Sequence, residues 1–173
     1  MSQAWGKSIK LHELGRGPRR VHLAPDEAER AAIARELDLQ GLPALVADLT
    51  VRPWLDGAEI TGRFEAIVEQ LCAVSLDPFE QALSGEIAVR VAPAGSPNAA
   101  RDEPGEAERD PEAPDPPDLL AGEAIDLAAY VVEHLALEID PFARKPGVEF
   151  EYAAPPEPES PFAVLQKLKD QKP

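Results

Sequence analysis

Residues 45–68 read LVADLTVRPWLDGAEITGRFEAIV, and this stretch carries the clearest periodic signal of the chain. Apolar and polar residues alternate on both sides of Asp56-Gly57, which is the period of a strand that is buried on one face. Asp-Gly between two alternating runs is typical of a β-hairpin. The stretch therefore predicts two antiparallel strands with these inward-facing residues: Leu45, Ala47, Leu49 and Val51, then Ala58, Ile60, Gly62, Phe64, Ala66 and Val68.

The segments around this hairpin extend it into an α+β domain. Residues 79–91 alternate again and predict a third antiparallel strand, and short strands are expected over 8–14 and 19–23. Helix-forming residues behind N-terminal acids predict helices over 25–39 and 126–139, with Asp126 as an N-cap. The whole chain, 1–173, is expected to be one α+β domain. Its core would be an antiparallel meander or a small barrel-like sheet, covered by the two helices.

Two segments outside this core have little to bury. Residues 93–118 hold seven prolines, eight acidic residues and two arginines. Such a segment cannot offset its ordering entropy, so a mobile acidic loop is expected, which either attracts a basic partner or only aids solubility. Residues 141–173 are expected to form an extended tail that ends in a short basic amphipathic helix. The apolar side of that helix either docks on the protein's own core or contacts another molecule.

The net charge of −15, from 17 Lys+Arg against 32 Asp+Glu, restricts the class of partner. A surface of this charge repels phosphate backbones and anionic membranes and attracts basic proteins, so neither DNA nor a membrane is an expected partner. The chain has no apolar run that could span a bilayer and no secretory signal near its start. With a single cysteine, it is expected in the reducing environment of the cytoplasm.

The residues that could carry chemistry do not form a recognisable motif, and we expect a protein without catalytic activity, metal or cofactor. His12, His22 and His134 lack the spacing of a metal or general-base motif. His12 and His22 are expected on neighbouring strands, which leaves a histidine pair open. Cys72 follows apolar strand residues, and this position favours a buried small side chain over a nucleophile.

Several motifs, in a fixed order, resemble the YceD family, the large ribosomal RNA subunit accumulation proteins. Before the acidic segment they are Leu49-x-Val51-x-Pro53-Trp54, Ile60-Thr61-Gly62 and Val68-Glu69-Gln70-x-Cys72-x-Val74-x-Leu76-x-Pro78-Phe79. After it they are Ile125-Asp126-Leu127, Asp140-Pro141-x-x-Arg144-Lys145-Pro146-Gly147 and Pro161-Phe162-Ala163-Val164-Leu165. Many members carry a C-x-x-C pair after the hairpin. Here Ser75 takes the second position, which excludes a role that needs two cysteines.

This resemblance implies a bacterial protein that is needed for normal accumulation of large-subunit ribosomal RNA and has no known catalytic activity. In that family the gene often lies beside the gene of a small basic large-subunit ribosomal protein. Together with the negative charge, this favours a ribosome-biogenesis factor that binds such a protein, with any RNA contact indirect or local. The alternative is direct RNA binding through small basic patches, Arg16, Arg19 and Arg20, and Arg144 and Lys145, which could equally be paired with acids.

The candidate partner-binding residues are two aromatic side chains, the acids of the loop, one basic pair and three apolar tail residues: Trp54, Phe79, Asp102, Glu103, Glu106, Glu108, Asp110, Glu112, Asp115, Asp118, Arg144, Lys145, Phe162, Leu165 and Leu168. The acids would speed capture and exposed apolar groups would hold the complex. A protein that binds a basic partner is expected to show an acidic surface beside an apolar strip. An RNA-binding protein is expected to show a contiguous basic face.

Overall fold

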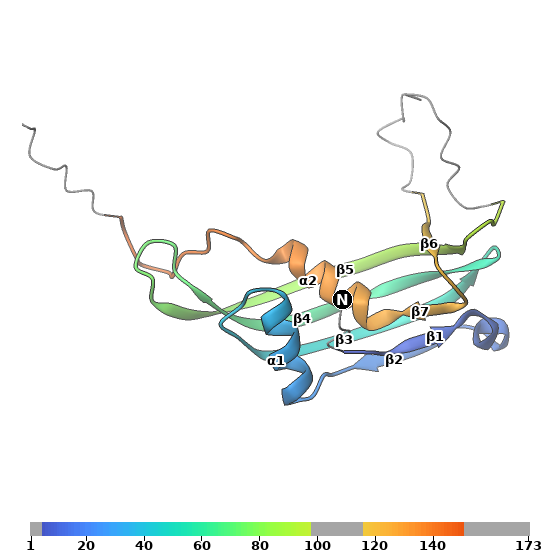
Figure 1. Cartoon of the computed structure of the whole chain (residues 1–173), viewed down its shortest axis with the longest axis horizontal. Coiled ribbons are helices and arrows are strands. Elements are labelled where there is room, and N and C mark those ends of the chain that lie inside the picture. The colour runs from blue at the N-terminus through green and yellow to red at the C-terminus, as the bar shows by residue number, and fades with distance from the viewer. Residues whose placement is uncertain (1–4, 98–115, 151–173) are drawn as a thin grey trace, which may run out of the picture.

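The structure, a computed structural model, describes residues 5–97 and 116–150 (Figure 1). In chain order its elements are β1 (Ser8–Lys10), the 3-10 helix η1 (Leu11–Arg16), β2 (Arg19–Leu23), α1 (Glu27–Glu36), β3 (Gly41–Trp54), β4 (Gly57–Leu71), β5 (Pro78–Pro93), β6 (Asp118–Leu120), β7 (Ala124–Asp126) and α2 (Leu127–Glu138). Neither α-helix of the described part is long and apolar enough to cross a bilayer.

The main sheet has five strands in the order β2-β3-β4-β5-β6. Strands β2 to β5 form an antiparallel meander, and β6 adds to β5 in parallel. Strands β1 and β7 pair separately as a two-stranded antiparallel sheet. The predicted α+β fold is confirmed, and the described strands form an open meander with β2 and β6 at its two edges.

The hairpin between β3 and β4 has a two-residue loop, Leu55-Asp56, because Trp54 pairs with Gly57. Leu55 takes the left-handed conformation, with φ 53°. The turn predicted over residues 54–57 is therefore confirmed, and Gly57 is the first residue of β4. A Cβ atom at Gly57 would lie 1.9 Å from the carbonyl oxygen of Val91. Glycine is thus required here by the close approach of β5.

Both helices cover one side of the main sheet, which we call the inner face (Figure 1). Helix α1 begins with a capping box, in which the backbone N–H of Asp26 donates to Glu29 and that of Glu29 donates to Asp26, each at 2.8 Å. The predicted cap of α2 is confirmed, because Asp126 accepts from two backbone N–H groups of the first turn. Ile33 of α1 and Val131 and Leu135 of α2 pack into one buried core with the predicted inward-facing residues.

Several short elements differ from the sequence prediction. Residues 8–14 were expected to be one strand, but the chain turns into η1 after Lys10. Strand β1 then pairs with β7 rather than with β2. The expectation that His12 and His22 lie on neighbouring strands is therefore wrong, since His12 belongs to η1 and His22 to β2.

The two end residues of the predicted acidic loop, Pro93 and Asp118, belong to strands. Strand β5 extends to Pro93, and Asp118 already belongs to β6, where it pairs with Val91. Residues 98–115 lie outside the described residues, as do residues 151–173, which include the predicted tail helix. Of the predicted tail, residues 141–150 are described, and they form neither helix nor strand.

Candidate binding face of the sheet

The opposite side of strands β2 to β5, which we call the outer face, has no described helix or strand packed against it (Figure 1). Its side chains come from alternate positions of each strand, so the strand register places them in rows. One row runs Arg52–Glu59–Arg90, the next runs Arg20–Thr50–Thr61–Ala88 and the third runs His22–Asp48–Arg63–Glu86. Two more rows, further from the β3–β4 turn, are Val46–Glu65–Ser84 and Ala44–Ile67–Ala82.

The last two rows form a depression of about 470 Å³ on the outer face. Its lining is mainly apolar: Ala44, Val46, Glu65, Ala66, Ile67, Ala82, Leu83 and Ser84. The next row away from the turn is Glu69 opposite Glu80. We call this region the glutamate-rimmed depression, with Ala44, Val46, Ile67 and Ala82 as its floor and Glu65, Glu69 and Glu80 as its rim. It combines an exposed apolar strip with negative charge.

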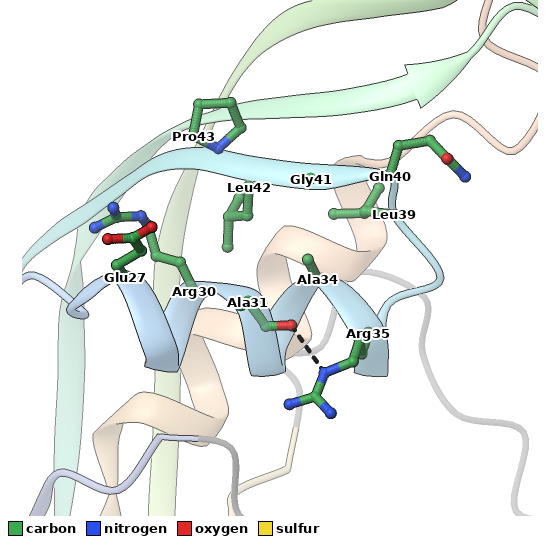
Figure 2. A pocket seen from close by; sticks show the side chains of 10 residues that line it. All are labelled: Glu27, Arg30, Ala31, Ala34, Arg35, Leu39, Gln40, Gly41, Leu42 and Pro43. Carbon is green, nitrogen blue, oxygen red and sulfur yellow. Dashed lines mark hydrogen bonds between the residues drawn. The ribbon is translucent and has the colours of Figure 1, made fainter.

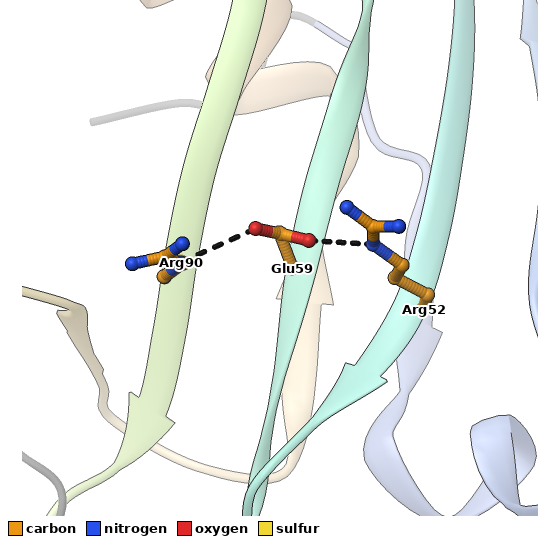
Figure 3. Close-up of polar contacts among 3 residues, drawn as sticks. All are labelled: Arg52, Glu59 and Arg90. Carbon is orange, nitrogen blue, oxygen red and sulfur yellow. Dashed lines mark hydrogen bonds and ion pairs between the residues drawn. The ribbon is translucent and has the colours of Figure 1, made fainter.

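Near the β3–β4 turn the same face carries arginines (Figure 3). Arg52 and Arg90 donate from Nε to opposite oxygens of Glu59, at 2.5 Å and 3.2 Å. The guanidinium carbon of Arg90 also lies 5.3 Å from the centre of the Trp54 ring. The hydrogen bond from Arg52, aided by that from Arg90, lowers the pKa of Glu59. This carboxylate therefore stays ionised and holds both guanidinium groups in place.

A second hollow, of about 500 Å³, lies between α1 and the start of β3 (Figure 2). Its two cationic side chains are engaged by backbone carbonyls: Arg30 donates to Pro25 at 2.9 Å and Arg35 to Ala31 at 3.2 Å. Neither a histidine nor a cysteine lines it.

The structure separates the two predicted aromatic contacts. Trp54 lies on the outer face at the β3–β4 turn, whereas Phe79 lies at the other end of the sheet, opposite Gln70 and at an inward-facing position. Both side chains are partly buried. Trp54 therefore belongs with the arginines, and neither residue belongs to the depression. The residues that line the depression were not among the predicted site residues.

The predicted charged residues are likewise spread apart. Asp118 in β6 accepts a hydrogen bond from the hydroxyl of Tyr130 at 3.1 Å. Arg144 and Lys145 are exposed beside the β4–β5 turn, while Arg19 pairs with Glu13 at 3.7 Å near β2. The two predicted basic patches thus do not merge. The other candidates lie outside the described residues: Asp102, Glu103, Glu106, Glu108, Asp110, Glu112, Asp115, Phe162, Leu165 and Leu168.

The histidines make local contacts. His22 Nδ1 lies 2.8 Å from Asp48 Oδ1 across strands β2 and β3, with both side chains largely exposed. His134 Nδ1 lies 2.8 Å from the backbone carbonyl of Tyr130, one turn earlier in α2. No group of three or more His, Cys, Asp or Glu side chains in residues 5–97 and 116–150 is placed to hold a metal ion.

Cys72 is fully buried and joins two segments that are distant in the sequence. The backbone N–H groups of Val74, Ser75 and Lys145 point to its sulfur at 3.4, 3.5 and 3.4 Å. These donors, chiefly that of Ser75, outweigh the effect of burial and lower the pKa of the thiol to about 6. The sulfur therefore acts as an acceptor that fixes the β4–β5 turn to the segment after α2, where Ala73 also donates to the Ala143 carbonyl.

Replacing Cys72 by alanine is expected to cause a pH-dependent loss of stability. The pKa of the thiol is about 6 in the folded protein and near the ordinary 9.0 in the unfolded chain. The ionised thiol therefore adds its full contribution to the free energy of unfolding above pH 9, and this contribution is lost as the pH falls towards 6. Urea unfolding of both proteins across this range should show a larger difference at high pH. Cys72→Ser, which keeps an acceptor that does not titrate, is the control, and a pH-independent difference for Cys72→Ala would contradict the assignment.

The fold and the site define an α+β domain in which no described helix or strand covers the outer face of the main sheet. Residues 60–169 match the model of the family described as Large ribosomal RNA subunit accumulation protein YceD. This chain belongs to the YceD family, which supports a role in the accumulation of large-subunit ribosomal RNA and thus in biogenesis of that subunit. The match begins within β4 and continues through α2, and the motif Leu49 to Trp54 lies before it. Neither a curated protein nor a solved structure matches the chain.

Proposed function

We propose that this protein is a non-enzymatic factor in biogenesis of the large ribosomal subunit, and that its glutamate-rimmed depression binds a small basic ribosomal protein of that subunit. The observation that supports this function is the apolar floor between ionisable carboxylates, on a sheet face without a described cover. An apolar strip beside acids suits a segment that alternates lysine or arginine with aliphatic residues. Such segments are repelled neither by the face nor by the net charge of −15.

The size of the depression fits one element of a partner. It spans three strands, β3, β4 and β5, and neighbouring strands lie about 4.8 Å apart, so its width is about 10 Å. An α-helix with its side chains has a diameter of about 10–12 Å. Val46 is 37% exposed, so apolar surface is free for a helix to cover. Covering it would slow dissociation, and the glutamates would orient the basic side chains.

The acidic segment adds long-range attraction in this proposal. Residues 98–115 contain seven acidic residues and two arginines. Opposite charges on two partners raise the rate of encounter, and this effect weakens with salt. The segment thus acts on capture, while the depression determines how long the partner stays.

The proposed function is tested by isolating the tagged protein from its own cells, with and without nuclease, at low and high salt. A small basic large-subunit ribosomal protein is expected to remain bound after nuclease treatment, and to be lost progressively as salt rises. Mass spectrometry identifies it. Retention of ribosomal proteins only while RNA is intact would contradict direct binding of a basic protein.

Replacing residues 98–115 by a neutral Gly/Ser linker of equal length is expected to slow capture of the isolated partner. The association rate constant should fall severalfold at low salt, because electrostatic steering is reduced, and the two proteins should converge at high salt. The dissociation rate constant should hardly change. Stopped-flow mixing measures both rates, and an unchanged association rate at low salt would assign the segment no role in capture.

A further inference from the structure

Two rows of the outer face nearest the β3–β4 turn carry more positive than negative charge. They contain Arg20, Arg52 and Arg90 and a single acid, Glu59. Successive rows on one face of a sheet lie about 7 Å apart, so these groups are neighbours. We call them, with the adjoining Trp54, the arginine end. Its local charge is opposite in sign to the −15 of the whole chain.

The two guanidinium groups are more exposed to solvent than the carboxylate that they bind. The side chain of Glu59 is 16% exposed, whereas those of Arg52 and Arg90 are 55% and 39% exposed. Both hydrogen bonds to Glu59 come from Nε, as Figure 3 shows. Among the described residues the terminal nitrogens of each guanidinium have no other hydrogen-bond partner, so they can donate to a ligand that approaches from solvent. Arg20 forms no ion pair with any residue in the described part of the chain.

A flat aromatic group completes this end. Trp54 is partly exposed and lies against Arg90. Thr50 and Thr61 lie in the same row as Arg20, between Arg52 and Glu59 and the row of charged residues beyond. Guanidinium groups bind phosphate oxygens in a fork geometry, and indole and guanidinium planes both stack on bases. Together these groups can bind a phosphate and a base at the same time.

We propose that the arginine end docks single-stranded RNA, with Arg52 and Arg90 on backbone phosphates and Trp54 stacked against a base. A single strand is favoured over a duplex because stacking on a side chain needs an unpaired, accessible base. The surface is distinct from the glutamate-rimmed depression, so the inference does not depend on the proposed protein partner. One face would then hold RNA at one end and a basic protein at the other.

The test is fluorescence anisotropy of a short labelled single-stranded RNA, titrated with the full chain over a range of salt concentrations. Arg52→Gln with Arg90→Gln is expected to weaken binding tenfold or more. Each lost phosphate contact lowers the salt slope for a single strand by about 0.7, so the slope should flatten by about 1.4. Trp54→Ala should weaken binding severalfold, and Trp54→Phe should retain most of the affinity.

Matched variants distinguish binding through the guanidinium forks from attraction by positive charge alone. Arg52→Lys with Arg90→Lys keeps the charge above Glu59 and is expected to bind with intermediate affinity, because lysine lacks the fork. Glu65→Gln with Glu69→Gln and Glu80→Gln, in the depression, should bind RNA at least as well as the wild type. The inference is overturned if the wild type fails to bind RNA at low salt, or if the double glutamine variant binds equally well. It is also overturned if duplex RNA or a polyglutamate peptide binds as tightly as the single strand.

Discussion

Replacing Phe64 by alanine is expected to lower the free energy of unfolding by about 3–5 kcal/mol, the usual loss for a large aromatic side chain in a packed core. Phe64 lies in the middle of β4, is 1% exposed and faces the side of the sheet that α1 and α2 cover. Its ring stands directly over Gly85, its partner on β5, where a Cβ atom would lie 2.6 Å from Phe64 Cε1. The truncated side chain would leave a cavity that these rigid strands cannot close.

Urea unfolding of the wild type and of Phe64→Ala measures this loss. Glu65→Ala is the matched control, because Glu65 is the next residue of the same strand and is exposed on the outer face. Its effect should stay within about 0.5 kcal/mol. Comparable losses for the two variants would mean that the inner and outer faces have been assigned wrongly.

Short-range signals explain which parts of this fold could be predicted from sequence. The alternation around Asp56-Gly57 identified both long strands, and the side chain of Asp126 marked the start of α2, because each pattern lies within a few neighbouring residues. The strands β6 and β7 have three residues each. Three residues do not establish a period, and their pairing depends on partners that are distant in the sequence. The burial of Trp5, which is 4% exposed, could not be predicted for the same reason, because it depends on contacts with residues that are distant in the sequence.

The binding face was harder to predict, because it depends on register. Arg52 meets Glu59 only when Trp54 pairs with Gly57, and a shift of one residue in this register would separate them. Arg90 joins them through the β4–β5 register, which follows a turn that Cys72 fixes. One signal could have revealed the depression. Ile67 and Ala82 are apolar at positions that alternation assigns to the solvent side, and such exceptions on neighbouring strands indicate an apolar patch.

The second large expected effect concerns the rim of the depression. Glu65→Gln with Glu69→Gln and Glu80→Gln is expected to weaken binding of the basic ribosomal protein by about tenfold, or about 1.4 kcal/mol. Glu69 and Glu80 are direct cross-strand partners, and like charges in that position destabilise a sheet by a few tenths of a kcal/mol, up to about 1 kcal/mol. Their removal should therefore make the protein slightly more stable. Weaker binding by a more stable protein cannot result from misfolding.

A second triple variant, with the same net charge as the variant with glutamines on the rim, serves as its control. Glu27→Gln with Glu36→Gln and Glu133→Gln also removes three carboxylates, from exposed positions of the two helices, on the opposite side of the sheet. Both triple variants change the net charge of the protein by the same amount. Only a partner that sits in the depression distinguishes them, because exposed charges further away than the Debye length, about 8 Å at physiological salt, are largely screened.

Calorimetric titration of the basic ribosomal protein, free of RNA, into the wild type and both triple variants at physiological salt shows whether the partner binds in the depression. We expect wild-type affinity for the variant with glutamines on the two helices, and a dissociation constant raised about tenfold for the variant with glutamines on the rim. Equal affinities for the two variants would contradict this expectation, since the partner would then respond to the net charge of the molecule and not to the glutamate-rimmed depression.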